Sequence, residues 1–300
     1  MKSRIPATLV AGVLYVSLAT ELQALVIQFD YTYDSSGFFT TNSQAKLILN
    51  QAAVAFNGFQ DQLAALTPGG GDTWYEQFSN PSGGSTVTVT NPVVQGNTVV
   101  VYVGAQALGG ALGFGGPGGW GASGSTQWLN TVAARGQSGA LATPATDFGP
   151  WGGTITFDSS ANWYFGTDLA GLGASQSDFL SVCEHELGHV LGFGTSGSWN
   201  TYVSGTSFTG PAATAAYGGP VPLDSATDTA HWQQGLMSTV NGTPQEVAMD
   251  PALTTGTRKL FTQLDYAGLS DVGWEIPEPA TVSLFVLVVG GLLARPRLRA

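Results

Sequence analysis

The sequence is poor in cysteine, in positive charge and in histidine. Its single cysteine, Cys183, excludes an internal disulfide framework. Nine Lys and Arg oppose 20 Asp and Glu, and five of the nine lie at positions 2, 4, 295, 297 and 299. The chain between these ends is strongly acidic, so we expect neither nucleic acid nor an anionic membrane surface as a partner. Any imidazole-based site is limited to the three histidines that are present, His185, His189 and His231.

Both ends of the chain have the layout of export signals. Residues 1–24 have a basic start, an apolar run from 7 to 19 and small residues suited to cleavage, as in a secretory signal peptide. At the other end, Pro277-Glu278-Pro279 precedes an apolar run over 281–294 and a basic tail. That run is shorter than the roughly 20 residues of a usual membrane-spanning helix. The arginines that follow it favour a cytoplasmic tail.

The C-terminal order of PEP, apolar helix and basic tail resembles the PEP-CTERM sorting signal of Gram-negative bacteria that produce exopolysaccharide. The resemblance implies cleavage by an exosortase-type processing enzyme and a transient membrane association through the apolar segment, read as a short transmembrane helix. It also implies a final location at the cell surface or in the extracellular matrix. We therefore expect a signal peptide (1–24), one folded domain (25–276) and a sorting segment (277–300).

Hydrophobic patterns divide the expected domain into strands and helices. Helical spacing of apolar residues runs from Ser43 to Leu66. Segments with strand character lie at 25–34, 85–92, 97–106 and 151–165. The glycine-rich stretch 107–125 lacks the Lys-Ser/Thr end of a phosphate-binding loop, so we expect a long surface loop there.

The stretch HELGH at 185–189 carries the clearest chemical signal. It lies in a helix predicted over about 177–192, which starts with polar capping residues. Positions i and i+4 share one helix face, so His185 and His189 point toward a common metal. Glu186 lies beside them as a general base for a water activated by zinc. We therefore predict a Zn2+ site with Glu186 as its catalytic residue.

The two histidines leave this site one ligand short, because catalytic zinc is usually held by three protein ligands. In the common extension HExxHxxGxxH the third histidine would stand at position 195, which is Thr195 here. His231 is the only histidine left, and glycines at 192 and 194 allow the chain to turn off the helix. Asp224 and Asp228 are alternatives, because a carboxylate also completes a two-histidine site.

Three blocks in order resemble the leishmanolysin-type branch of the metzincin metallopeptidases: HELGHVLGF, then HWQQGLM after a long insertion, then FTQLDYAGLSDVGW. The resemblance implies an α+β, zincin/metzincin-like fold, with a twisted mixed sheet and an active-site helix in the N-terminal subdomain and a loop-rich C-terminal subdomain. It implies three zinc ligands, a general base, a helix-ending glycine and a Met-turn residue: His185, His189, His231, Glu186, Gly192 and Met237. Met249 competes for the last role. The cysteines of eukaryotic leishmanolysins are absent, so their disulfide-braced C-terminal region is not expected.

The function predicted from these features is that of an exported zinc metalloendopeptidase acting on protein or peptide substrates. The substrate is expected to pair with an edge strand at 153–158, which the glycine-rich stretch borders. For oxyanion stabilisation the choice stays open among tyrosines 202, 217 and 266, and the aromatic residues 199, 217 and 232 either line a pocket or pack. One alternative is an exported matrix or adhesion protein with structural zinc, which has no need of Glu186. Another is a zinc hydrolase of a different amide or ester bond.

Overall fold

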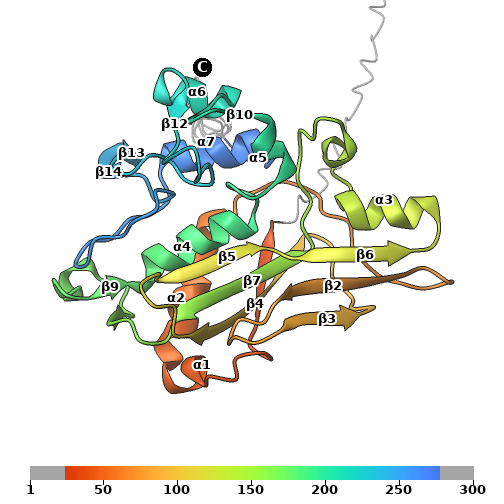
Figure 1. The fold of residues 1–300 in the computed structure, drawn as a ribbon, viewed down its shortest axis with the longest axis horizontal. Helices are drawn as coiled ribbons and strands as arrows, with labels where there is room; N and C mark the ends of the chain where they lie inside the picture. The colour runs from red at the N-terminus through yellow and green to blue at the C-terminus, as the bar shows by residue number, and fades with distance from the viewer. Residues whose placement is uncertain (1–23, 278–300) are drawn as a thin grey trace, which may run out of the picture.

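In a computed structural model, residues 24–277 form a mixed α and β protein with several small sheets (Figure 1). The predicted signal peptide lies, apart from its last residue, outside these described residues, as does the sorting segment after Pro277. Within residues 24–277, no helix is long and apolar enough to cross a membrane. The apolar run at 281–294 falls outside the described range, so the membrane association remains a prediction.

The largest sheet has four strands, which lie in the order β1 (Val26–Asp30), β4 (Thr98–Gln106), β7 (Gly152–Asp158) and β5 (Gly113–Pro117). The first three are parallel, and β5 is antiparallel to β7. β4 reads TVVVYVGAQ, an apolar run without alternation, and it is buried along almost its whole length. Such runs are typical of parallel strands that are covered on both faces.

The edge of this sheet differs from the one expected. Residues 153–158 lie in β7, which is hydrogen-bonded to a neighbour on each side. The edge strand on this side of the sheet is β5, and the glycine-rich stretch forms both β5 and β6 (Gly119–Ser123), which belongs to a second sheet. Both the edge position of 153–158 and the long surface loop at 107–125 are therefore wrong predictions. Glycine lowers strand propensity, yet it is used in strands where another backbone or side chain comes very close.

Two helices, α2 (Ser43–Ala53) and α4 (Phe179–Val190), pack against each other and share the main core with this sheet. α2 passes into a 3-10 turn at Val54–Phe56 and ends well before the predicted Leu66, because Asn57-Gly58 interrupts the helical spacing. At the start of α4, the Asp178 side chain accepts a hydrogen bond from the Ser181 backbone N–H.

A second sheet has the order β3 (Thr86–Thr90), β2 (Thr73–Ser79) and β6. β2 alternates strictly between exposed and buried residues, as expected of a strand with one face on a core. That core contains Trp74, Tyr102 and Trp151, and it also holds Glu76, whose carboxylate accepts a hydrogen bond from the Tyr102 hydroxyl at 2.5 Å.

One buried cation connects four chain segments next to this second core. Arg135 follows α3 (Thr126–Ala134) and is fully buried. Its guanidinium donates at 2.6–3.0 Å to four backbone carbonyls, those of Ala64, Gln95, Thr98 and Pro150. Burial lowers the pKa of Arg135 to about 10, so the side chain stays charged at neutral pH.

The chain after α4 contains only short elements around one longer helix, α7 (Gln263–Val272). Figure 1 shows this half, coloured from teal to blue, on the other side of α4 from the four-stranded sheet. Its remaining elements are α5 (Gly197–Thr201), β10 (Val203–Ser204), β11 (Ser207–Phe208), α6 (Pro211–Tyr217), β12 (Val221–Pro222), β13 (Met237–Val240) and β14 (Thr243–Glu246). Short elements before α4 are α1 (Phe38–Thr41), β8 (Trp163–Tyr164), β9 (Ser177–Asp178) and 3-10 turns at Ser138–Leu141 and Leu169–Gly171.

Candidate metal centre

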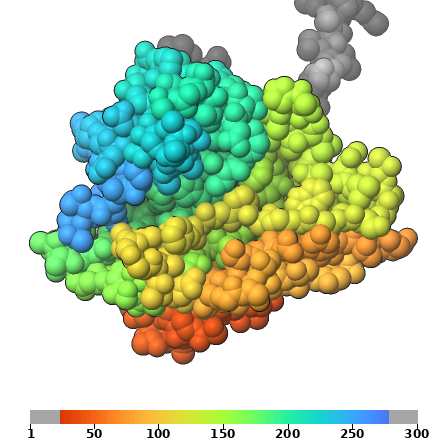
Figure 2. All heavy atoms as spheres, in the orientation of Figure 1, coloured from red at the N-terminus to blue at the C-terminus, as the bar shows by residue number. Residues whose placement is uncertain are grey.

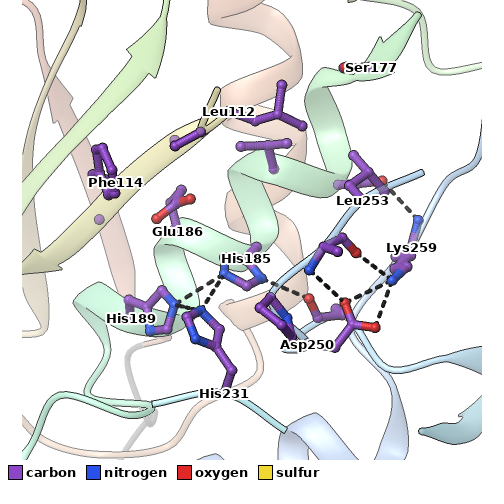
Figure 3. A pocket seen from close by; sticks show the side chains of 18 of the residues that line it. Leu112, Phe114, Ser177, His185, Glu186, His189, His231, Asp250, Leu253 and Lys259 are labelled. Carbon is purple, nitrogen blue, oxygen red and sulfur yellow. Dashed lines mark hydrogen bonds and ion pairs between the residues drawn. The ribbon is translucent and has the colours of Figure 1, made fainter. Parts of the chain in front are cut away.

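The three histidines converge at one point beside α4. The Nε2 atom of His189 lies 3.1 Å from that of His185 and 3.0 Å from that of His231, and the last two are 3.3 Å apart (Figure 3). Nitrogens held about 2.0–2.1 Å from one tetrahedral zinc ion are about 3.3 Å from each other. The donor set therefore fits a zinc ion, and it forms the one group of potential metal ligands found among residues 24–277.

The opposite ring nitrogens fix the direction of each imidazole. Nδ1 of His185 lies 2.8 Å from the Ala248 carbonyl, and Nδ1 of His189 lies 2.8 Å from the Phe193 carbonyl. A carbonyl oxygen only accepts, so both Nδ1 atoms are the protonated ones and both Nε2 atoms carry a free lone pair. Such outer hydrogen bonds are usual for metal-binding histidines.

The third imidazole has a carboxylate as its outer partner. Nδ1 of His231 lies 2.9 Å and 3.0 Å from the two oxygens of Asp228. A carboxylate in this position orients the ring and raises its basicity as a ligand. Asp228 therefore lies behind His231, and Asp224 is exposed with only its backbone N–H bonded to the His231 carbonyl. Neither aspartate shares the ligand cluster.

His231 reaches this position through a contact with the turn that ends the helix. Gly192 and Gly194 have φ angles of +101° and +72°, which favour glycine. A Cβ at Gly194 would lie 2.3 Å from the Ala230 carbonyl oxygen, so the segment before His231 rests directly on this turn. Gly192 thus lies in the turn that follows α4.

Buried aromatic side chains secure the same segment. Trp199 and Trp232 are fully buried and pack with Phe193 and Phe208. The indole N–H of Trp199 donates to the Thr229 carbonyl at 3.0 Å. Both tryptophans are therefore packing residues beneath the segment that carries His231, and they do not line the cavity described below.

Thr195 stands where the short-spacing motif would have its histidine. Its hydroxyl donates to the His189 carbonyl at 2.7 Å and so satisfies an acceptor near the end of the helix. The side chain lines the cavity, and His231 is the residue that joins the other two histidines.

A cavity of 640 Å³ opens over the histidines. Its lining includes all three imidazoles, Glu186, residues 110–115, which lead into the start of β5, and residues 250–253. In the space-filling view, the cyan-to-blue C-terminal half sits above the yellow segment that contains β5, and the cavity lies between these parts (Figure 2). A bound ligand would therefore contact the sheet edge, the helix and the C-terminal half together.

Burial dominates the titration of this site. It raises the pKa of Glu186 to about 8, against a smaller opposing effect of a hydrogen bond with the Gly115 backbone. It lowers the pKa of His185 to about 4, and the neighbouring His231 adds to this effect. The pKa of His189 is lowered well below its usual value by burial and by the other two imidazoles. Neutral imidazoles are the form that binds a metal.

Met249 is the methionine that packs against the helix of the site. Met237, the predicted Met-turn residue, does not lie there. Met237 begins β13 with a side chain that is 57% exposed. Met249 is fully buried, and its Sδ lies 2.7 Å from where a Cβ of Gly188 would be, against the α4 backbone. Met237 comes six residues after His231, and that spacing gave the wrong choice because β13 turns its side chain toward solvent.

None of the three candidate tyrosines lines the cavity. Tyr202 packs on Phe208, Tyr217 is 41% exposed on α6, and the Tyr266 hydroxyl donates to the Ala55 carbonyl at 2.9 Å. No side chain for oxyanion stabilisation is identified among the tyrosines of the described residues.

An ion pair in the cavity wall was missed by sequence reasoning. Lys259 is buried and its ammonium donates to both oxygens of Asp250 at 2.8 Å, to Glu246 at 2.8 Å and to the Ala252 carbonyl at 2.7 Å. Only four cations lie in the acidic middle of the chain, and two of them are adjacent, Arg258 and Lys259. Their rarity was the available signal for a structural role beside the site.

Comparisons with known proteins reach only part of this chain. A family model described as SPBPB7E8-like matches residues 145–210. This match spans β7, α4 and α5, so it contains His185, Glu186 and His189 and ends before His231. No curated protein and no solved structure matches the chain.

Proposed function

We propose that this protein is an exported zinc-dependent endopeptidase of the leishmanolysin-like metzincin type. The observation that carries the proposal is the convergence of three Nε2 atoms within 3.3 Å of one another in a cavity that also contains Glu186. His185, His189 and His231 would hold the zinc. Zinc in such a site supplies a Lewis acid that polarises a carbonyl and lowers the pKa of water.

Glu186 would carry the proton in the reaction. It lies in the cavity next to the histidines and outside the ligand set, so its carboxylate is free to accept a proton from the attacking water. It would then pass this proton to the nitrogen of the leaving amine.

The arrangement of the elements supports a zincin/metzincin-like fold. A mixed sheet with one antiparallel edge strand lies beside the helix that carries HELGH, and a half made of short elements supplies the third histidine. In addition, Met249 packs beneath this helix, where the family resemblance expects a Met-turn residue.

The edge strand β5 supports an extended peptide as the substrate. One side of β5 pairs with β7, no described strand pairs with its other side, and Gly113–Gly115 line the cavity. An extended peptide would add to this edge by main-chain hydrogen bonds and pass over the histidines. β5 would therefore pair with the substrate in place of residues 153–158, which lie in β7 and are paired on both sides.

The two signal-like ends support export and a place at the cell surface or in the extracellular matrix, after processing by a signal peptidase and an exosortase-type enzyme. The alternative of a matrix protein with structural zinc is less well supported, because structural sites usually close with a fourth protein ligand. The three histidines here face a cavity instead.

The protein purified with its ends as processed by the cell tests the proposal. We expect about one zinc per chain and cleavage of unfolded casein that a chelator abolishes and added zinc restores. Glu186→Gln should keep the zinc and lose at least roughly 100-fold in kcat, because the carboxylate moves a proton and binds no metal. Zinc without any hydrolysis would favour the adhesion alternative, and cleavage of esters but not of casein would favour a non-peptidase hydrolase.

A further inference from the structure

Two glycines of β5 face the zinc helix at very short distance. Strand alternation places Gly113 and Gly115 on the same face as Phe157 and Ile155, their fully buried partners on β7. α4 lies against this face, and Figure 3 shows Glu186 directed toward β5. A Cβ at Gly113 would lie 2.6 Å from Glu186 Oε1, and one at Gly115 would lie 2.9 Å from Oε2. A side chain at either position would occupy the space of the carboxylate.

The need for glycine here is spatial and not conformational. Neither Gly113 nor Gly115 has a positive φ angle, so the backbone would accept other residues. The next residue, Gly116, faces the opposite side of the strand, and a Cβ built there would meet no atom within 4 Å. The close approach is therefore confined to the two glycines that cover Glu186.

We propose that Gly113 and Gly115 are positioning residues for Glu186. Because they have no side chains, the edge strand lies directly on the carboxylate, with one glycine over each oxygen, and Gly115 adds a backbone hydrogen bond. The carboxylate is thus confined between α4 and β5, on the side of the cavity that the substrate strand would occupy. This inference rests on the proposed function, in which Glu186 transfers the proton.

The first test compares two alanine variants of the same strand in the full-length zinc-loaded protein. Gly113→Ala should lower kcat for a quenched fluorescent peptide by about 10–100-fold, because a displacement of about 1 Å in a reacting group costs up to about 100-fold. KM and zinc content should stay close to the wild-type values, since the main-chain groups of β5 that would pair with the substrate and the three histidines are unchanged. Gly116→Ala is the matched control on the opposite face of the same strand, and it should lower kcat much less than Gly113→Ala because its methyl group meets no atom within 4 Å.

A second test measures the contact itself without any activity. Gly113→Ala should lower the melting temperature in the wild-type background and lower it much less in a Glu186→Ala background, because the atoms that meet the new methyl group are then absent. For Gly115→Ala the decrease should persist in both backgrounds, because its Cβ also lies 2.6 Å from the Glu186 backbone oxygen. Melting temperatures remain measurable even if a variant is too unstable for reliable kinetics.

The outcomes separate the two proposals. A wild-type protein that binds zinc but hydrolyses no peptide overturns the proposed function. An active wild type in which Gly113→Ala and Gly116→Ala have equal kcat overturns the positioning role alone. Equal decreases in melting temperature for Gly113→Ala in both backgrounds would also overturn it, because the methyl group would then not be meeting Glu186.

Discussion

Replacing Asp228 by alanine should weaken zinc binding without abolishing it. The carboxylate accepts a hydrogen bond from His231 Nδ1 at 2.9 Å, and its Oδ1 atom also accepts one from the Ala230 backbone N–H at 3.1 Å. It therefore orients His231, the proposed third ligand, and the loop that carries it. Loss of such an outer partner typically lowers metal affinity by about 10–100-fold, or roughly 1.4–2.7 kcal/mol.

Because Asp228 is partly exposed to solvent, we expect Asp228→Ala to lower zinc affinity by a factor in the lower part of the roughly 10–100-fold range. The Asp228 side chain is 36% exposed, so water takes over part of its hydrogen bonding in the variant. Asp228→Asn keeps an acceptor oxygen and loses the charge, and should therefore lie between Asp228→Ala and wild type. His231→Ala removes a ligand and should cost more than about 100-fold in affinity.

Competition with a chromophoric chelator at fixed pH measures these affinities directly. Asp224→Ala is the matched control, because Asp224 is exposed and contacts His231 only through its backbone. If Asp228→Ala lost zinc as completely as His231→Ala, the carboxylate would itself be a ligand. That result would refute its assignment as an outer hydrogen-bond partner of His231. An equal effect of Asp224→Ala would refute it as well, since the two aspartates differ in their contact with the imidazole.

Three further predictions concern stability and processing. Arg135→Met should lower the free energy of unfolding by at least about 3 kcal/mol in a denaturant titration, because four buried carbonyls lose their donor, and a loss below about 1 kcal/mol would contradict this. Burial raises the pKa of Glu76 to about 7 from 4.5, so the folded state holds this proton more tightly and stability should fall as the pH rises from 4.5 to 7. The fall should be shallower in Glu76→Gln, and an unchanged slope would remove Glu76 as a cause. Mass spectrometry of the native exported protein should find it cut after residue 19 or 24 and near Pro277, whereas intact ends would contradict the processing signals.

The local part of the site was predictable from the sequence. Helical periodicity alone places positions i and i+4 on one face, and α4 at Phe179–Val190 agrees with the helix predicted over about 177–192. His185, Glu186 and His189 therefore follow from spacing within a single helix. β4 was predictable for a similar reason, because an uninterrupted apolar run is typical of a parallel strand buried on both faces.

Only the tertiary structure decided which distant residues join that helix. His231 comes to the other two imidazoles because Ala230 rests on the turn at Gly194, and Met249 rather than Met237 lies beneath because its chain segment packs on Gly188. The edge strand β5 left no pattern in the sequence, since glycines show no alternation of side chains. Spacing along the chain reports the geometry of one element, whereas these contacts depend on close packing between segments brought together by the fold, where the absence of a side chain matters as much as its presence.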